Sequence, residues 1–402
     1  ACVKPSKEAE IEKAFIEWQQ ENSMILSPRQ AEAVRNLKYR ISIVTGGPGT
    51  GKTTCLRAIM DVYHKVWPSE HILLMAPTGL AAKRMAESTK TNSATIHKAC
   101  CLVPADNNSG FVAQSECRIC GFVGIDEMSM VGEHLFAFAI DAVLNSPSTR
   151  IVLLGDTDQL APVSRGDVLR DLIQCSVIKT VRLDVNYRQG STSTITDASI
   201  KIRENRAYSG MTRNLKFDDE FNFISVTNPD QKTEADQILS RVVEEYQKGV
   251  AKYGVKGTII LTPTHFDKGT ATGYLCKNRV NAVIQSVVNP KTDTKPFLEV
   301  NHQTFMVGDR IIQRRNTDQV INGDLGTIIS INKVDNETRV EIIFDSKEDV
   351  LVYDSNDVKD IELAYAVTIH SSQGSEFPCC IIPVSSSYGP MLTKPVYYTG
   401  IT

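Results

Sequence analysis

The chain has 402 residues, which is too long for one ordinary hydrophobic core and predicts two to three domains. Its composition, 42% hydrophobic and 23% charged, is that of a globular protein, and no apolar run approaches the roughly 20 residues of a membrane-spanning helix. A net charge of −3 argues against indiscriminate polyanion binding, but it leaves room for a local basic groove. Because residues 1–10 also lack the apolar core of a signal peptide, we expect a cytoplasmic protein with no membrane contact.

The first half of the chain has the pattern of an α/β protein with a parallel sheet. Ile11, Phe15 and Trp18 are spaced as on one face of a helix, and Ser27 followed by Pro28 marks the start of the next helix. Continuously apolar runs then predict strands that are buried on both faces, at 41–46, 71–77, 122–127 and 150–156. The segments between these strands are long enough for crossover connections.

The α/β pattern resumes after about residue 220. FNFISV and GTIILTP are strand-like, and TEADQILSRVVEEYQKGV between them is helical. Residues 300–360 differ, because their short β-rich runs are separated by NGD and DNET turns, which predicts a small antiparallel barrel inserted into the second α/β unit. AYAVTIH and PCCIIPVSS then return to the main sheet.

The stretch GGPGTGKTT, residues 46–54, fits G-x-x-x-x-G-K-[ST] and lies between a strand and a helical stretch, the context that a phosphate-binding loop needs. Its glycines let backbone N–H groups turn toward phosphate oxygens. Lys52 would supply charge at the β- and γ-phosphates, and Thr53 would offer a hydroxyl to Mg²⁺. The sequence therefore predicts a nucleotide site whose loop residues are Gly47, Gly49, Gly51, Lys52, Thr53 and Thr54.

Two carboxylates, Asp126 and Glu127, end a predicted strand. A carboxylate in that place can hold hydrated Mg²⁺, and its neighbour can orient and deprotonate water. Water, rather than an organic hydroxyl, is then the expected acceptor, which favours a nucleoside triphosphatase over a kinase. The alternative for the pair is a solvent-facing strand end.

Adjacent cysteine pairs at 100–101 and 379–380 suit a reducing compartment better than a disulfide framework. One C-x-x-C, at 117–120, is a weak metal signal without a second half, so we expect free thiols beside a loop. A zinc site is the alternative, with ligands from this set: His97, Cys100, Cys101, Cys117 and Cys120.

Further motifs occur in a fixed order along nearly the whole chain: LSPRQAEAV, APTGLAAKRM, SATIHKA, LLGDTDQLAPV, LDVNYRQ, VGDRIIQRRN with VINGDLGTI, and AYAVTIHSSQGSEFP. Together with DEMSM they resemble the motifs of superfamily-1 helicases of the RecD-like branch. The resemblance implies two RecA-like P-loop ATPase cores with ATP bound between them, single-stranded DNA across their top and 5′-to-3′ movement. It also implies that the inserted barrel is of the Src-homology type.

With that resemblance, we expect five segments. They are an N-terminal helical segment (1–26), a first RecA-like core (27–215) with a loop or hairpin insertion near 101–120, the first part of a second core (216–299), the barrel (300–360) and the final part of the second core (361–402).

The resemblance also implies roles for residues around ATP. Gln30 would select adenine, Gln159 would sense the γ-phosphate, and Arg188 would stabilise transition-state charge from across the cleft. Gly374 and Glu376 would approach the cleft or the ribose. The alternative for Arg188 is a surface ion pair.

For DNA, the resemblance implies contacts to backbone phosphates rather than bases, because a motor steps along any sequence. The matching residues are Thr78, His97, Thr262, Thr368 and His370. Taken singly, each is more often an ordinary turn or core residue. Residues 103–116 are expected to touch the strand or split the duplex, with a passive surface loop as the alternative.

Two departures from the family pattern stand out. Ser371 follows the histidine where the family has lysine, which removes one charge that could grip phosphate. The sequence also stops at YYTGIT, before the expected arginine finger, so we expect the natural protein to continue; ending at Thr402 would cripple hydrolysis.

The sequence thus predicts a monomeric ATP- and Mg²⁺-dependent helicase or translocase that acts on single-stranded and forked DNA, with DNA repair or recombination proteins as partners. One alternative is a nucleic-acid-binding scaffold that uses ATP as a clamp without moving. Another is the helicase part of a larger nuclease or relaxase polypeptide.

Overall fold

The computed structural model describes residues 4–104, 111–113, 120–144, 148–187, 193–204, 215–265, 275–334 and 337–402. By its contacts the chain divides into two compact units, Ala1–Glu220 together with Thr402, and Phe221–Ile401. Within the described ranges, no helix is both long and apolar enough to cross a bilayer.

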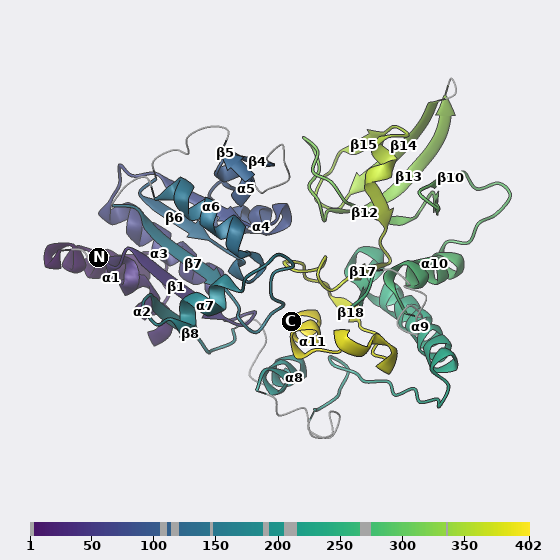
Figure 1. Ribbon diagram of the computed structural model, residues 1–402, viewed down its shortest axis with the longest axis horizontal. Coiled ribbons are helices and arrows are strands. Elements are labelled where there is room, and N and C mark those ends of the chain that lie inside the picture. The colour runs from purple at the N-terminus through teal and green to yellow at the C-terminus, as the bar shows by residue number, and fades with distance from the viewer. Residues whose placement is uncertain are drawn as a thin grey trace. The chain divides into compact units, whose positions relative to one another are not determined.

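The first unit is built on a six-stranded parallel sheet in the order β3-β2-β6-β7-β1-β8. Figure 1 labels β6, β7, β1 and β8 of this sheet. Its strands are β1 (Ile41–Gly46), β2 (Ile72–Ala76), β3 (Ser93–Thr95), β6 (Phe122–Ile125), β7 (Arg150–Gly155) and β8 (Lys179–Leu183). The predicted α/β class with a parallel sheet is therefore confirmed, and the four predicted strands are β1, β2, β6 and β7.

Both faces of this sheet are covered, which explains why its strands are continuously apolar. Neighbouring residues alternate between two hydrophobic clusters: Val44 and Leu154 pack on one face, and Ile43 and Leu153 pack on the other. The first cluster includes residues of α1–α4, and the second includes residues of α5–α7. The strand ends are thereby held in register by cores on both sides.

The helices of the first unit are α1 (Pro5–Glu21), α2 (Pro28–Arg35), α3 (Lys52–Val66), α4 (Gly79–Thr89), α5 (Ile96–Ala99), α6 (Glu133–Val143), α7 (Val168–Gln174) and α8 (Thr194–Arg203), with 3-10 turns η1 (Asn36–Lys38) and η2 (Met128–Met130). A short antiparallel pair, β4 (Leu102–Pro104) and β5 (Phe111–Ala113), follows α5. Ser27 caps α2 in a capping box with Gln30, as the Ser-Pro start predicts.

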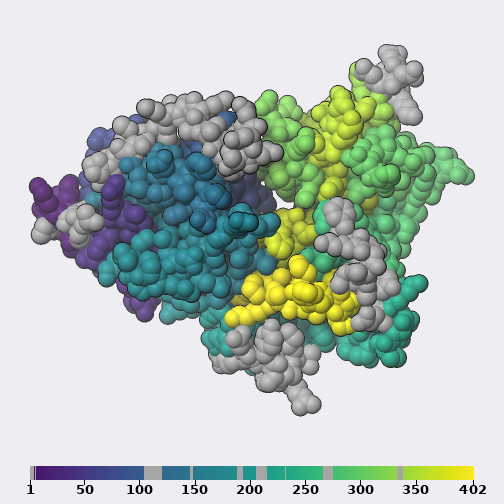
Figure 2. Space-filling model, in the orientation of Figure 1, coloured from purple at the N-terminus to yellow at the C-terminus, as the bar shows by residue number. Residues whose placement is uncertain are grey.

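Helix α1 docks on α3, the helix that follows the phosphate loop. Ile11, Phe15 and Trp18 are buried to 2% exposure or less, and Trp18 Nε1 donates to Asp61 Oδ2 on α3 over 2.8 Å. In the space-filling view the purple side chains of α1 lie against the body of the first unit (Figure 2). The predicted apolar face of this helix is therefore confirmed.

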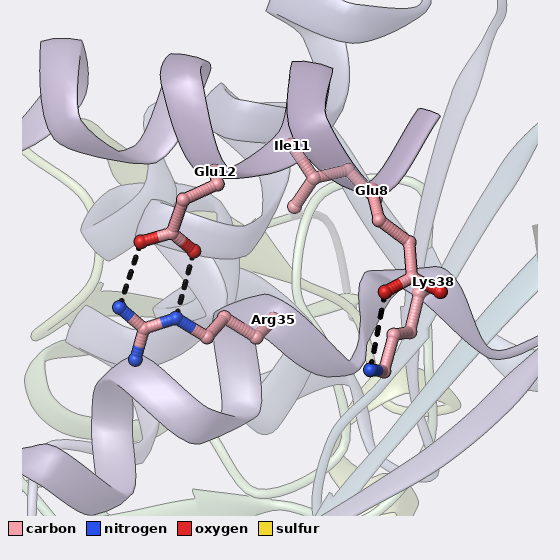
Figure 3. Close-up of a pocket in the computed structure, with 5 residues that line it drawn as sticks. All are labelled: Glu8, Ile11, Glu12, Arg35 and Lys38. Carbon is pink, nitrogen blue, oxygen red and sulfur yellow. Dashed lines mark hydrogen bonds and ion pairs between the residues drawn. The ribbon is translucent and has the colours of Figure 1, made fainter. Parts of the chain in front are cut away.

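A small pocket lies between α1, α2 and η1 (Figure 3). Arg35 Nε and Nη2 donate to the two oxygens of Glu12 over 2.8 Å each, and Lys38 Nζ donates to Glu8 over 3.3 Å. The Arg35–Glu12 pair is exposed and the Lys38–Glu8 pair is partly exposed, so each contributes little stability. Their charges face one another, so the pocket is a seam between helices rather than an anion site.

The second unit contains a three-stranded parallel sheet in the order β17-β9-β18. Its elements are α9 (Gln231–Gly257), β9 (Thr258–Thr262), α10 (Lys277–Val288), β17 (Ala366–Thr368), β18 (Cys379–Ile381), η5 (Ser386–Met391) and α11 (Lys394–Ile401). The predicted helix and the GTIILTP strand are α9 and β9. The predicted strand in FNFISV is wrong: residues 222–228 have no regular structure, and Phe223 is 47% exposed rather than packed between covering layers.

The region between α10 and β17 is antiparallel, as predicted. The hairpin of β10 (Phe297–Val300) and β11 (Gln303–Met306) precedes a five-stranded sheet in the order β15-β14-β13-β12-β16. Its strands are β12 (Arg310–Gln313), β13 (Leu325–Val334), β14 (Glu337–Phe344), β15 (Val350–Tyr353) and β16 (Ile361–Leu363), with η4 (Asp357–Asp360) before β16. Because β16 runs almost directly into β17, this sheet is joined to the parallel sheet of the same unit by a short connection.

Candidate active site

The phosphate loop connects β1 to α3 through a turn that requires glycine. Gly49 and Gly51 have φ angles of 73° and 81°, in the left-handed region that disfavours other residues. A Cβ atom on Gly51 would lie 2.5 Å from Gln30 Nε2. The turn therefore depends on both the conformational freedom and the small size of glycine.

Lys52, the first residue of α3, folds back over this loop. Its Nζ donates to the carbonyl oxygens of Gly46, over 2.7 Å, and Gly47, over 3.1 Å. Thr53 and Thr54 follow in the first turn of α3 and are half-buried. The loop thus combines a cationic side chain with the N-terminus of a 15-residue helix, which favours an anion.

Gln30 is 5% exposed and lies against the loop. Its Nε2 donates to the Thr50 carbonyl over 3.4 Å, and its Oε1 accepts from the Ser27 N–H over 3.1 Å. Both ends of the amide are therefore engaged, and the side chain connects the start of α2 to the loop. Its selection of adenine stays a prediction.

Asp126 and Glu127 follow β6 at the same edge of the sheet. The Asp126 N–H donates to the Met75 carbonyl over 3.0 Å, and the Glu127 N–H donates to Asp126 Oδ1 over 2.8 Å. Glu127 is held in a left-handed conformation, with φ at 52°. A non-glycine residue in this conformation indicates local strain at a constrained position.

The two carboxyls share one electrostatic environment with the lysine. Burial raises the pKa of Asp126, and the charge of Lys52 opposes that rise. Burial raises the pKa of Glu127 to about 7, helped by the charges of Asp126 and Asp156 and opposed by Lys52 and Arg84. A carboxyl with a pKa near 7 is suited to accept a proton from water at neutral pH.

Asp156 directly follows β7 and is 2% exposed. Its Oδ1 accepts from the Asp158 N–H over 3.0 Å, and its carbonyl accepts from the Gln159 N–H over 3.3 Å. This turn sets Gln159, half-buried, directly after the strand that neighbours β1. The structure therefore brings Lys52, Asp126, Glu127 and Gln159 to one edge of one sheet.

Sequence reasoning missed two residues of this site, Asn186 and Tyr187. The Tyr187 N–H donates to the Gly49 carbonyl over 2.7 Å, and Asn186 Nδ2 donates to the Pro48 carbonyl over 3.2 Å. Tyr187 is 55% exposed. The sequence signal that could have found them is the motif LDVNYRQ, which begins at the end of β8, the strand beside β1. Arg188, the residue expected to act from this motif, lies outside the described residues.

Thr78 and His97 lie at the same edge of the first unit. Thr78 Oγ1 caps α4 by accepting from the Ala81 N–H over 3.2 Å, and His97 lies in α5, where burial lowers its pKa. They follow β2 and β3, whose last residues, Ala76 and Thr95, are paired in register. Their contact with DNA stays a prediction.

In the second unit the predicted residues gather after β9 and β17. Thr262 and Thr368 are register partners at the ends of these parallel strands. Thr262 is fully buried and donates to the Thr264 carbonyl over 3.1 Å, whereas Thr368 Oγ1 lies 2.8 Å from Ser371 Oγ. His370 is half-buried, which lowers its pKa.

The turn after β17 also carries the predicted Gly374 and Glu376. Gly374 has a φ of 76°, and Glu376 is exposed. Their approach to a nucleotide stays a prediction.

The zinc alternative depends on Cys117, which lies outside the described residues. Cys100 and Cys120 are buried thiols, and Cys101 is half-buried. In the part of the chain that the structure describes, no group of three or more His, Cys, Asp or Glu side chains is placed to hold a metal.

Comparison with known proteins finds three families along the chain. An AAA domain matches residues 25–227, which is just over half of the chain. The ATP-dependent RecD-like DNA helicase SH3 domain matches residues 280–344, and the UvrD-like helicase C-terminal domain matches residues 363–402.

Among curated proteins, the chain is 27% identical to the ATP-dependent RecD2 DNA helicase of Deinococcus radiodurans over 381 residues, which cover 94% of this chain and 48% of that protein. It is 25% identical to the RecBCD enzyme subunit RecD of Haemophilus influenzae over 466 residues, which cover 98% of this chain and 69% of that protein. The chain thus spans about half the length of the RecD2 helicase.

Solved structures share the fold at low identity. Bacteroides Pif1 bound to ssDNA matches with a TM-score of 0.54 and 18% identity, covering 94% of this chain and 89% of that one. Pif1 helicase from Candida albicans matches with a TM-score of 0.52 and 17% identity, covering 94% and 92%. From its family matches and relatives, the chain belongs to the AAA domain family, in the RecD-like branch of superfamily-1 helicases.

Proposed function

We propose that this chain is the motor part of an ATP-dependent DNA helicase or translocase. One observation carries the proposal: Lys52 folds back over the glycine loop that follows β1, and Asp126 and Glu127 follow β6 at the same end of the same parallel sheet. A cation, a helix N-terminus and two carboxyls together suit a triphosphate, a metal ion and a water molecule. The names of the relatives, ATP-dependent RecD2 DNA helicase and RecBCD enzyme subunit RecD, support DNA as the track.

In the proposed mechanism, Lys52 and the loop N–H groups hold the β- and γ-phosphates. Thr53 and Asp126 would hold Mg²⁺, which neutralises charge on phosphate oxygens when bound; a hydroxyl and a carboxylate are the hard oxygen ligands that this ion prefers. Glu127 accepts a proton from the attacking water, and its pKa of about 7 suits that role.

Further roles are part of the proposal. Gln159 would sense the γ-phosphate, and Arg188 would stabilise transition-state charge. Gln30, Gly374 and Glu376 would contact the nucleoside side. To these we add Tyr187, because an exposed ring fastened beside Gly49 offers a face for the base.

We also propose two RecA-like cores. The first comprises residues 27–215, and the second comprises residues 216–299 together with 361–402, with a Src-homology-like barrel at 300–360 inserted into it. Cleft closure on ATP would alternate the grip on a single strand, moving the protein 5′-to-3′ into forked duplex. Pif1 helicases, whose solved structures share this fold, unwind forked dsDNA and, in the Bacteroides protein, are bound to ssDNA, which fits this substrate class. Repair or recombination proteins are the proposed partners of a monomer.

Strand displacement by the full-length protein on DNA with a 5′ or a 3′ single-stranded overhang tests the proposal. We expect ATP-dependent unwinding from the 5′ overhang only, together with DNA-stimulated ATP turnover. Unwinding only from the 3′ overhang would overturn the direction. ATP-dependent DNA binding without turnover or unwinding would instead favour an ATP-clamped scaffold.

A further inference from the structure

Four charged or ionisable side chains meet inside the second unit, near the junction of its antiparallel and parallel sheets. Glu362 on β16 accepts from Lys277 Nζ over 2.5 Å, and Arg314 Nε lies 3.3 Å from the same Glu362 oxygen. His265 Nε2 lies 2.7 Å from Lys277 Nζ. One carboxylate is therefore shared by two basic side chains; burial lowers the pKa of Lys277, and the hydrogen bond and charge of Glu362 oppose that shift.

The cluster has an excess of positive charge at neutral pH. Burial and the charge of Lys277 lower the pKa of His265, so the imidazole is neutral. The side chain of Lys277 is 3% exposed and that of Arg314 is 33% exposed, so both are largely shielded from water. The single negative charge of Glu362 balances only one of these two basic groups. Such a site attracts a further anion, because a charge removed from water interacts strongly with its neighbours.

The Arg314 side chain reaches the turn after β17. Its Nε faces Glu362, while its Nη1 donates to Ser371 Oγ over 3.5 Å. Ser371 Oγ lies 2.8 Å from Thr368 Oγ1, so a guanidinium and two hydroxyls converge. In the same turn, Gln373 Nε2 is a buried donor with no hydrogen-bond partner among the described residues.

We propose that Arg314, with the hydroxyls of Thr368 and Ser371, forms a subsite for one backbone phosphate of single-stranded nucleic acid. Glu362 is a positioning residue: by holding Nε, it leaves the Nη end of the guanidinium for the phosphate, and the planar fork of arginine suits phosphate oxygens. Arg314, which directly follows β12, thus provides a positive charge beside Ser371, the position at which the family has a lysine. This inference rests on the proposed function.

The test measures binding of a fluorescein-labelled oligo(dT) strand by anisotropy, between about 50 and about 200 mM salt. For Arg314→Ala we expect binding about fivefold weaker, and a slope of log affinity against log salt that is smaller by about 0.7. The matched control is Arg315→Ala, which removes a neighbouring guanidinium that is 77% exposed and lies 3.4 Å from Asp360; its slope should equal that of the unaltered chain.

A second variant separates charge from folding. Adding Ser371→Lys to Arg314→Ala puts a cation back beside Thr368 and should restore most of the lost slope, while circular dichroism confirms that each variant is folded. If Arg314→Ala and Arg315→Ala lose the same slope, or if the lysine restores none of it, the subsite is wrong although the proposed function stands. If the unaltered chain binds no oligo(dT), the proposed function fails together with the subsite.

Discussion

The backbone N–H of Tyr187 donates to the carbonyl oxygen of Gly49 over 2.7 Å, so the segment after β8 is fastened onto the phosphate loop. Since the bond uses the main chain, substitution of the side chain leaves it in place. Tyr187 is 55% exposed, so its side chain is accessible to a ligand at the loop.

Tyr187→Ala should therefore weaken ATP binding by about fivefold, the loss expected for one aromatic contact of about 1 kcal/mol. Tyr187→Phe keeps the ring and should bind ATP like the unaltered chain. Titration with a fluorescent ATP analogue measures both variants. Equal affinity for the alanine and phenylalanine variants would show that the ring contributes nothing.

Glu127→Gln should lower the rate of ATP turnover by about 10²–10⁴-fold, because a glutamine cannot accept a proton from water. ATP binding should persist, since Lys52 and the loop are unchanged. Steady-state turnover and nucleotide titration distinguish the two effects. The control is Glu133→Gln, an exposed acid at the start of α6, which should turn over ATP normally. Normal turnover by Glu127→Gln would assign the general base elsewhere.

Trp18→Ala should destabilise the first unit by about 3–5 kcal/mol, as expected when a large buried aromatic is truncated. Trp18→Phe keeps most of the packing and loses the hydrogen bond to Asp61, so it should cost less. Urea unfolding gives both free energies when it is monitored by far-UV circular dichroism, a signal that does not depend on the tryptophan being replaced. A cost for alanine below that for phenylalanine would contradict the docking of α1 on α3.

Asp309→Asn should destabilise the second unit by about 2–5 kcal/mol. Asp309 is fully buried, and its Oδ1 accepts from Asn289 and Tyr365, while its Oδ2 accepts from Gln285 and from the Met306 N–H. Whichever way an amide turns, its NH₂ group faces two donors, and buried unsatisfied donors are costly.

The matched control is Asp318→Asn, which changes an exposed aspartate in the loop after β12. It should leave the urea midpoint unchanged. If Asp309→Asn unfolds at the same urea concentration as the control, the four hydrogen bonds contribute nothing to the second unit.

Glu362 gives a pH dependence with a defined sign. Burial by itself would raise the pKa of Glu362, but the hydrogen bond and charge of Lys277, with Arg314, outweigh it and lower the pKa below 4.5. The folded state thus holds the proton more weakly than the unfolded state. The contribution of Glu362 to the free energy of unfolding is therefore fully present above pH 4.5 and is lost as the pH falls through the lowered pKa.

Glu362→Gln should accordingly destabilise the second unit at pH 7, by about 3–5 kcal/mol, because it leaves Lys277 buried without a carboxylate. It should also remove part of the acid-induced loss of stability seen in the unaltered chain. Urea unfolding at a series of pH values from neutral to acidic measures both effects. Parallel curves for the two proteins would show that this carboxyl is not linked to folding.

Local features of the chain were predictable from sequence because their causes lie within a few residues. The strand, glycine turn and helix around Lys52, the cap at Ser27 and the apolar face of α1 each depend on neighbours along the chain. The expected strand in FNFISV shows the limit. Its composition favours a strand, but strands need partners, and the described structure provides none there.

The sequence by itself therefore determined the α/β class, the phosphate loop and the acidic pair after β6. Only the tertiary structure decided that Asn186 meets Pro48, which is 138 residues away, and that Lys277 shares Glu362, which is 85 residues away, with Arg314. The physical reason is that such contacts follow from the order of strands in a sheet and from the helices that pack on it, as α10 with Lys277 packs on β17. Setting β8 beside β1, and β16 beside β12, brings together segments whose separate sequences carry no mark of one another.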